Sequence, residues 1–375
     1  MTWMTLKRIA AHQVDEIYRR ALLLERVHAL EPVGRRTLAA SMRLTEREVR
    51  AAAEALKDEG LIALNTSGMQ LTIEGRKLIP EVRALCRSIS GLQELENDLR
   101  EHLGIKQLVV VPGDVDDNRL ALVELGRATA QAVRQALRDG MVIAISGGST
   151  MSEVARAMTP TAKNVMVVPA RGGFGRMAQM QADAVAGELA QRVGGDCRLM
   201  HLPEGMDQDT LSRAAKLPGV KATLALMRNA DIILYGVGRA EDMAQRRSLP
   251  ANVRRLLQKN RAVGEALGDF FDVNGRVVYQ SPSLSSELSS GKPGTLSILA
   301  AGGRRKGEAV LAAVRWHPPA ALIVDEGVSR EMLALLQGRA HGGEGTAGEH
   351  ESAPAEEQPA SEDKDYNIIG GSLHD

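Results

Sequence analysis

The stretch Met141-Val-Ile-Ala-Ile-Ser-Gly-Gly-Ser-Thr150 decides how the larger part of this chain folds. Val142 to Ile145 is a short run of β-branched and aliphatic residues, which predicts a buried strand, and helical spacing resumes from Met151 to Met158. A glycine-rich turn between a strand and a helix directs backbone N–H groups and the positive end of the helix dipole toward one point. The turn therefore predicts a phosphate site, with a plain turn of small residues as the alternative. The residues expected to bind the phosphate are Gly147, Gly148, Ser149 and Thr150.

Short apolar runs alternate with helical spacing along residues 105–338. This order is typical of a doubly wound, mostly parallel sheet with helices on both faces, so we predict an α/β fold. The other strands are expected at 108–111, 165–168, 197–202, 232–237, 296–300 and 322–324. The helices are expected at 120–137, 179–193, 220–228, 306–314 and 329–336.

Ligands of such sheets bind at the carboxyl ends of the strands, so the residues after each strand are candidate site residues. Arg171 lies among glycines, where its guanidinium could clamp an oxyanion through two parallel hydrogen bonds. Two glycine turns and several basic residues at one edge favour a bisphosphate, or a phosphosugar with other polar groups. The further candidates are Gln181, the pair Arg246 and Arg247, Lys306 after Gly302-Gly303, and Glu265, which is either a partner of sugar hydroxyls or an ordinary surface carboxylate.

The composition restricts the class of protein. A length of 375 residues predicts two or three domains, and 44% hydrophobic with 2% aromatic residues predicts aliphatic cores. The formal net charge is zero, so any affinity for nucleic acid must come from a local patch. We expect a cytoplasmic protein without disulfide, metal or cofactor, because the two cysteines are far apart, the eight His are scattered, and no apolar run has the length of a membrane span or signal peptide.

The first 75 residues have the element order of a winged helix-turn-helix domain. Apolar residues recur at three- and four-residue steps from Gln13 to Leu30, and a short helix is expected from Arg36 to Met42. Thr45 and Glu48 form a capping box that opens a third helix. Two short strands, 61–64 and 69–73, flank the turn 65–68 and form the wing. We therefore expect the third helix to enter the major groove of DNA.

Arginines of this domain are the candidate DNA contacts. Residues 1–90 contain 15 Lys or Arg against 11 Asp or Glu, which is a weak basic excess, and the alternative is a charged face that is merely solvated. Contacts to phosphates fix position, whereas contacts to base edges carry sequence information. The third helix offers Arg47, Arg50 and Lys57, and Arg35, Arg36 and Arg43 are expected to contact the DNA backbone.

The segment 76–104 is predicted to be a linker helix. Leu78, Val82, Leu85, Ile89, Leu92 and Leu99 follow alternating four- and three-residue steps, which gives a seam of heptad character. The seam either pairs two subunits or docks onto a neighbouring domain of its own chain. Residues 339–375 are rich in Gly, Ala, Pro and Glu and are predicted to be a disordered acidic tail.

Several motifs together resemble the central glycolytic genes regulators, bacterial repressors of the SorC class. The resemblance covers about residues 6–338, and the region past about Gln337 has no counterpart. It depends on Glu31-Pro-Val-Gly-Arg-Arg-Thr-Leu-Ala-Ala-Ser41, Ile145-Ser-Gly-Gly-Ser-Thr150, Val168-Pro-Ala-Arg-Gly-Gly173, Ala262-Val-Gly-Glu265 and Ala301-Gly-Gly303. Ser149 departs from the Thr that we expect more often in this family, although the hydroxyl is retained.

The resemblance implies a repressor that binds operator DNA ahead of glycolytic genes and senses fructose 1,6-bisphosphate in a domain similar to sugar-phosphate isomerases and deaminases. Independently of the resemblance, paired DNA half-sites need paired readers, so we expect a homo-oligomer, either a dimer or a tetramer. The resemblance also implies that Gly148, Ser149 and Thr150 hold one phosphate and that Glu265 contacts the sugar. The residues that it places against phosphates are Arg171, Gln181, Arg246 and Lys306.

The rival interpretation is a sugar-phosphate isomerase or deaminase on the same kind of sheet. Such an enzyme needs a general base within hydrogen-bond reach of a carbon-bound proton. An attached DNA-binding domain favours a sensor, so we expect no catalytic residue. The acidic residues that could serve as a base are Asp114, Asp116, Glu204, Asp207 and Asp325.

Overall fold

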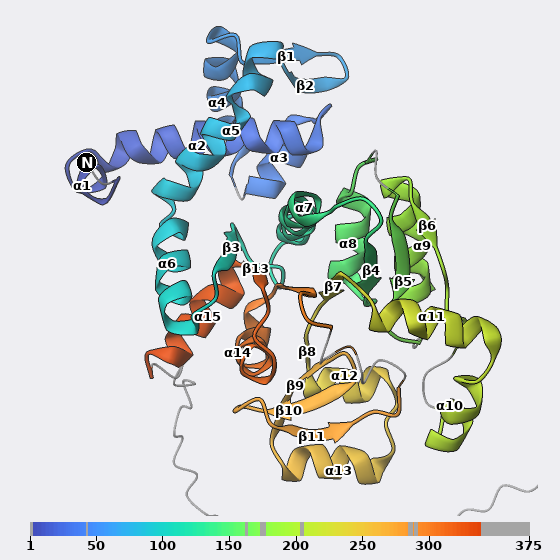
Figure 1. The fold of residues 1–375 in the computed structure, drawn as a ribbon. Helices are drawn as coiled ribbons and strands as arrows, with labels where there is room; N and C mark the ends of the chain where they lie inside the picture. Colours follow the sequence, from blue (N-terminus) through green and yellow to red (C-terminus); the bar gives the residue numbers. More distant parts are fainter. Residues whose placement is uncertain are drawn as a thin grey trace, which may run out of the picture. The chain divides into compact units, whose positions relative to one another are not determined.

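A sheet of seven parallel strands forms the centre of the larger domain in this computed structural model (Figure 1). The structure describes residues 3–42, 44–161, 164–172, 178–202, 206–283, 288 and 292–338. The predicted acidic tail lies outside these residues. In spatial order the strands are β3 (Gln107–Val111), β13 (Ala321–Asp325), β12 (Leu296–Ala301), β7 (Ile232–Tyr235), β4 (Val142–Ile145), β5 (Met166–Pro169) and β6 (Asp196–Cys197).

The chain changes direction within this sheet between β4 and β7. From β4 it proceeds outward to β5 and β6, and it then returns to the other side of β4 with β7, β12 and β13. Such a switch point leaves a crevice at the carboxyl ends of the strands, which is where open α/β sheets bind ligands. The loop Ser146–Gly148 leaves β4 at this point.

Helices cover both faces of the sheet, as the alternating pattern predicted (Figure 1). One face carries α7 (Arg119–Ala136), α8 (Ser149–Ala157) and α9 (Ala182–Val193), whose buried side chains form one aliphatic core. The other face carries α6 (Leu92–Leu103), α11 (Pro218–Arg228), α14 (Gly307–Trp316) and α15 (Glu326–Leu336) around a second core. The α/β fold class is confirmed. One strand is shorter than predicted: β6 is Asp196–Cys197, so only Cys197 of the predicted strand 197–202 belongs to the sheet.

A second, antiparallel sheet is inserted between β7 and β12. Its strands lie in the order β11 (Val277–Gln280), β10 (Asp269–Asp272), β9 (Ala262–Ala266) and β8 (Gly238–Arg239), with α12 (Ala240–Arg246) and α13 (Ala251–Lys259) beside them. The sequence pattern did not predict this sheet. It matters for the site because β9 places Glu265 at its buried centre, opposite Phe270 of β10.

The N-terminal domain has the predicted winged helix-turn-helix order. Its helices are α1 (Trp3–Ile9), α2 (Ala11–Leu30), α3 (Arg35–Met42) and α4 (Glu46–Asp58), and its wing is β1 (Ile62–Asn65) with β2 (Gly68–Leu71). Both halves of the predicted capping box at Thr45 and Glu48 are present. Glu31, from the first motif of the resemblance, accepts a hydrogen bond of 2.8 Å from the Leu71 N–H and so ties the end of α2 to the wing.

The predicted continuous linker helix is wrong. Residues 73–103 form two helices, α5 (Ile73–Ile89) and α6, because Gly91 adopts a left-handed conformation (φ 73°) between them. The apolar seam is divided accordingly. Val82 of α5 is buried in the core of the winged domain, whereas Leu92 and Leu99 of α6 are buried in the core of the larger domain. The docking alternative therefore accounts for these side chains, and α6 has no apolar seam left for pairing subunits.

Candidate functional site

The glycine turn after β4 has the geometry of an anion-binding helix start. Gly148 is the N-cap of α8 and has φ 106°, a conformation that favours glycine. Among the described residues, the backbone N–H groups of Ser149, Thr150 and Met151 have no hydrogen-bond acceptor. The Thr150 side chain is buried and that of Ser149 is exposed. Three free N–H groups at the positive end of a helix dipole suit an anion.

The main chain at Gln181 lies against this turn. A Cβ atom on Gly147 would come within 2.5 Å of the Met180 carbonyl oxygen and 3.3 Å of the Gln181 carbonyl carbon, so glycine is needed for the close approach. The Gly148 N–H donates to the same Met180 oxygen at 2.8 Å. These contacts join the turn to the N-cap of α9, which is Gln181.

Arg171 meets Glu265 inside the protein. The Arg171 guanidinium Nη1 lies 3.0 Å from Glu265 Oε1, and both side chains are 4% exposed. Arg247 Nη2 lies 2.6 Å from the same oxygen, and the Gly268 N–H donates to it at 2.7 Å. Burial by itself would raise the pKa of Glu265, but the charges of Arg247 and Arg171 hold the pKa below its usual value. Glu265 is thus an ionised, buried carboxylate, and its interpretation as a surface residue is wrong.

The other oxygen of Glu265 is available to a ligand. All donors to this carboxylate that lie in the described chain reach Oε1. Oε2 accepts no hydrogen bond from those residues. Arg171 is placed beside the turn as well, because the Ala170 N–H donates to the Ile145 carbonyl oxygen of β4 at 2.8 Å. A hydroxyl group in the crevice could therefore donate to Oε2.

Arg246 and Arg247 have different surroundings, although the local sequence pattern offered them as a pair. Arg247 is buried against Glu265 and has its guanidinium 5.7 Å from the centre of the Phe270 ring. Arg246, at the end of α12, is exposed. The pKa of the Lys306 ammonium group is lowered, mainly by burial and in addition by the positive charge of Arg246. Neither Arg246 nor the Lys306 side chain has a hydrogen-bond or ion-pair partner in the part of the chain that the structure describes, so these two cations are free to bind an anion.

The acidic residues considered as catalytic bases are mostly engaged in holding the fold. Asp325 Oδ2 accepts from the N–H groups of Val115 at 2.7 Å and Gly303 at 2.8 Å, and its Oδ1 caps α15. Asp114 lies 2.6 Å from Arg304 Nε, and that hydrogen bond helps to keep the pKa of Asp114 low in spite of burial. Asp207 is the N-cap of α10 (Gln208–Ala214). Glu204 lies outside the described residues.

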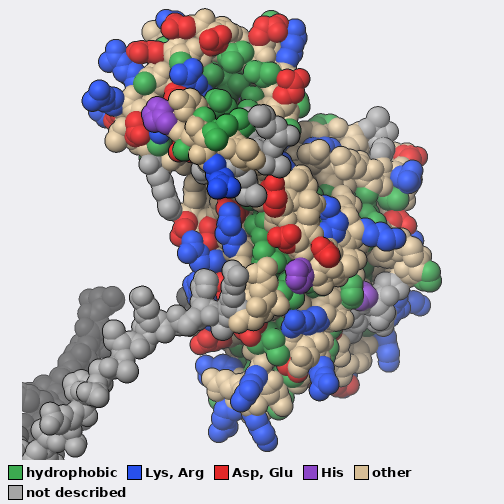
Figure 2. All heavy atoms as spheres, turned by 90° about the vertical axis from the view of Figure 1, so that its left-hand side faces the viewer, with side chains coloured by type: hydrophobic (Ala, Val, Ile, Leu, Met, Phe, Trp, Pro, Cys, Tyr) green, Lys and Arg blue, Asp and Glu red, His purple; other side chains and the backbone are tan. Residues whose placement is uncertain are grey.

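The candidate DNA-binding side chains lie on exposed surfaces of α3 and α4. Arg36 Nε lies 3.2 Å from Glu46, and Arg50 Nε lies 2.8 Å from Glu54. On the face drawn in Figure 2, acidic and basic side chains alternate over this domain. DNA phosphates would therefore have to replace these glutamates as partners. The remaining candidates, Arg35, Arg47 and Lys57, are exposed, and Arg43 lies outside the described residues.

Comparison with known proteins places both domains. Residues 17–86 match the family model described as "CggR N-terminal DNA binding domain", and residues 87–334 match the model "Putative sugar-binding domain". The central glycolytic genes regulator of Priestia megaterium is 33% identical over 330 residues, which cover 87% of this chain and 96% of that protein. The chain belongs to the central glycolytic genes regulator family. A second regulator of this family, from Bacillus subtilis, is 34% identical over 83% of this chain and 92% of that protein.

Solved structures agree with this membership of the central glycolytic genes regulator family. A SorC family transcriptional regulator from Enterococcus faecalis superposes with a TM-score of 0.59 at 31% identity, and the match covers 64% of this chain and 99% of that one. The full-length sorbitol operon regulator from Klebsiella pneumoniae shares the fold over 84% of this chain, at a TM-score of 0.59 and 16% identity. The chain is a transcriptional regulator with a DNA-binding and a sugar-binding domain, and the proteins that it matches are regulators, not enzymes. Among the described residues, no helix is long and apolar enough to cross a membrane.

Proposed function

We propose that the chain represses glycolytic genes and is released from its operator, or remodelled on it, by fructose 1,6-bisphosphate. The proposal rests on two candidate anion-binding sites at one edge of the sheet. The first is the start of α8, with the free N–H groups of residues 149–151, and the second is the unpaired cation pair Arg246 and Lys306. A sugar with a phosphate at each end has the chemistry to occupy both.

The proposed effector residues are those predicted from the sequence, but the roles of Glu265 and Arg171 differ from the predicted ones. Glu265 Oε2 would accept a sugar hydroxyl, while Oε1 is held by two arginines. Arg171 would act partly by fixing Glu265. Arg247, buried on the same carboxylate, joins the set as a positioning residue. The direct phosphate ligands would be Gly147, Gly148, Ser149, Thr150, Gln181, Arg246 and Lys306.

Residues 1–75 would bind the operator in the cytoplasm, residues 105–338 would bind the effector, and the segment 76–104 would transmit the signal between them. The names of the Priestia and Bacillus relatives support glycolytic genes as the target. A winged domain that reads a two-fold DNA site requires a partner copy, so we propose a homodimer or tetramer. Because α6 is packed into its own larger domain, the subunits would associate through other surfaces.

A titration of the DNA complex tests this function. Operator DNA is selected from a random pool with the full chain, and complex formation is followed by fluorescence anisotropy. Fructose 1,6-bisphosphate should weaken or remodel the complex at lower concentration than fructose 6-phosphate, by at least about tenfold, since each charge-assisted hydrogen bond contributes roughly 1.5–3 kcal/mol. Unphosphorylated fructose should have no effect. A complex that ignores every phosphorylated sugar contradicts the proposal.

The variant Lys306→Met separates sensing from folding. Lys306 carries a half-buried positive charge that forms no ion pair in the described chain, so its removal should change the free energy of unfolding little. The effector response should fall by at least about tenfold, for loss of a charged phosphate partner. Lys259→Met, at an exposed position of α13, is the matched control and should respond like the parent protein.

A further inference from the structure

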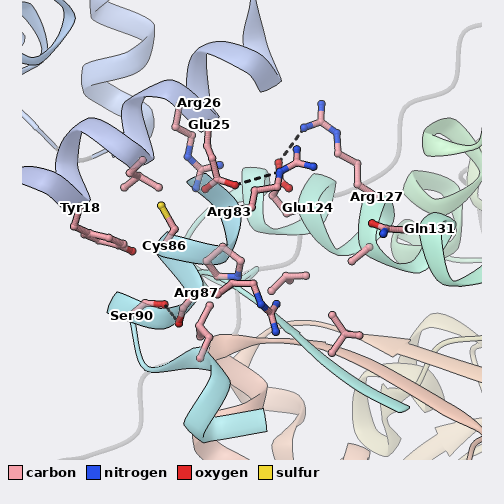
Figure 3. A pocket seen from close by; sticks show the side chains of 16 residues that line it. Tyr18, Glu25, Arg26, Arg83, Cys86, Arg87, Ser90, Glu124, Arg127 and Gln131 are labelled. Carbon is pink, nitrogen blue, oxygen red and sulfur yellow. Dashed lines mark hydrogen bonds and ion pairs between the residues drawn. The ribbon is translucent and has the colours of Figure 1, made fainter. Parts of the chain in front are cut away.

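A cavity lies away from the sheet edge, between the winged domain and the larger domain. It has a volume of about 200 Å³. Figure 3 shows α2 and α5 of the winged domain on one side and β3 and α7 of the larger domain on the other. None of the proposed effector residues lines it. The cavity is therefore independent of the effector site, and its contents must be inferred from its own lining.

Charged side chains are concentrated in this cavity, and most of them are paired. Arg83 Nε lies 3.3 Å from Glu25 Oε1, and Arg127 Nη1 lies 3.0 Å from Glu124 Oε1 (Figure 3). Arg87 forms an ion pair with Glu96, which lies outside the lining, and donates to the Val110 carbonyl oxygen at 2.7 Å. Three of the four arginines in the wall are thus neutralised.

Arg26 is the fourth arginine, and its charge is not neutralised. Its Nε is buried and has no hydrogen-bond partner, and its guanidinium has no carboxylate within ion-pair distance among the described residues. Glu25, whose pKa burial raises although the charges of Arg83 and Arg26 oppose the rise, already forms an ion pair with Arg83. A buried guanidinium nitrogen without an acceptor is costly, and an incoming oxyanion would supply the missing acceptor.

We propose that this interdomain cavity binds a small monoanionic metabolite through Arg26. One unpaired positive charge requires one negative charge, so the ligand is a carboxylate or a singly charged phosphate. The volume limits its size, because a cavity of about 150 Å³ holds one benzene ring and about 200 Å³ therefore holds roughly eight non-hydrogen atoms. Leu22, Val109 and Ala128 supply an apolar wall for a short carbon chain.

Calorimetric titration of the full chain with propionate tests this site, with propionamide as the neutral ligand of the same shape. Inorganic phosphate is titrated separately in the Lys306→Met background, so that the proposed effector site does not contribute. Saturable binding of propionate or of phosphate identifies which oxyanion the cavity prefers, and either result supports the site. Propionamide should bind at least about tenfold more weakly, since it lacks the charge.

Two variants locate the binding. Arg26→Gln removes the charge and should weaken binding by at least about tenfold. Ala128→Met fills the cavity from α7 without changing any charge and should abolish binding. Arg20→Gln lies on the same helix outside the cavity, where Arg20 pairs with Glu16 at 2.8 Å, and it should bind like the parent. The inference is overturned if neither anion binds saturably, or if binding survives both Arg26→Gln and Ala128→Met. Neither result would bear on the effector site.

Discussion

At the scale of single residues, three nitrogen atoms converge on one oxygen of Glu265, and two of them belong to buried arginines. Glu265→Gln would remove the carboxylate that both guanidinium groups contact. Removing one partner of a buried ion pair typically costs about 3–5 kcal/mol, so we expect a loss of that order in the free energy of unfolding. Urea denaturation at neutral pH measures it. Glu241→Gln, at an exposed position of α12, is the control and should be nearly neutral.

The same carboxylate makes stability depend on acid. The pKa of Glu265 is lowered in the folded protein from an ordinary value of 4.5, so below that value the unfolded chain binds the proton more readily. Its stabilising contribution is therefore complete above about pH 5 and is lost as pH falls from there through the lowered pKa. The difference in stability between the parent protein and Glu265→Gln should shrink on acidification in this range. A difference that stays constant down to pH 3 would show that the charge of Glu265 is not what stabilises the cluster.

Sequence reasoning at the residue scale could place those residues whose position depends on a single local turn. Gly147, Gly148 and Gln181 lie together because the turn after β4 and the start of α9 are determined by local chemistry. The local pattern could not distinguish Arg246 from Arg247, since adjacent residues share every feature of that pattern except the direction of the side chain, and only the resemblance favoured Arg246. That direction is set by the end of α12 against the second sheet, which brings Phe270 and Glu265 to Arg247 alone.

At the scale of elements, the capping box that begins α4 offers a direct test. The Glu48 N–H donates to Thr45 Oγ1 at 3.2 Å, and the Thr45 N–H donates to Glu48 Oε2 at 2.8 Å. Thr45→Ala removes one of these bonds and should cost about 1 kcal/mol of stability. Thr37→Ala, at an exposed interior position of α3, is the control and should change stability little. If both variants melt alike, the cap does not determine where α4 begins.

Most elements were predictable because their periodicity is local. The parallel strands are apolar runs buried on both faces, and helices follow them with a 3.6-residue period. The second sheet was missed because β9, Ala-Val-Gly-Glu-Ala, holds a glycine and a buried carboxylate whose stability depends on arginines from other elements. The break in the linker was missed for a similar reason. A lone glycine is tolerated within a helix, and only the separate packing of α5 and α6 gives Gly91 its left-handed conformation.

At the scale of the whole molecule, the Arg87 side chain connects the two domains. It belongs to α5, forms an ion pair with the buried Glu96 of α6, and donates to the Val110 carbonyl oxygen of β3 at 2.7 Å. Arg127 adds a weaker bridge from α7 to the Ala29 carbonyl oxygen at 3.4 Å. A signal from the effector domain to the winged domain requires elements of this kind, whose arrangement both sites can bias. We therefore expect the corner between α5 and α6 to carry the coupling.

A pair of variants at this corner separates coupling from stability. Arg87→Met alone would leave the buried Glu96 without its main partner and should cost about 3–5 kcal/mol of stability. The double variant Arg87→Met with Glu96→Met removes both charges and should recover most of that loss, since apolar residues of similar volume often replace a buried pair without penalty. Operator affinity and effector affinity should both persist in the double variant, because neither surface is altered. The effect of the sugar phosphate on operator affinity should be lost. If the double variant is stable and still responds to the effector as the parent does, the coupling passes through other contacts, and the bridge from Arg127 to Ala29 is the next to remove.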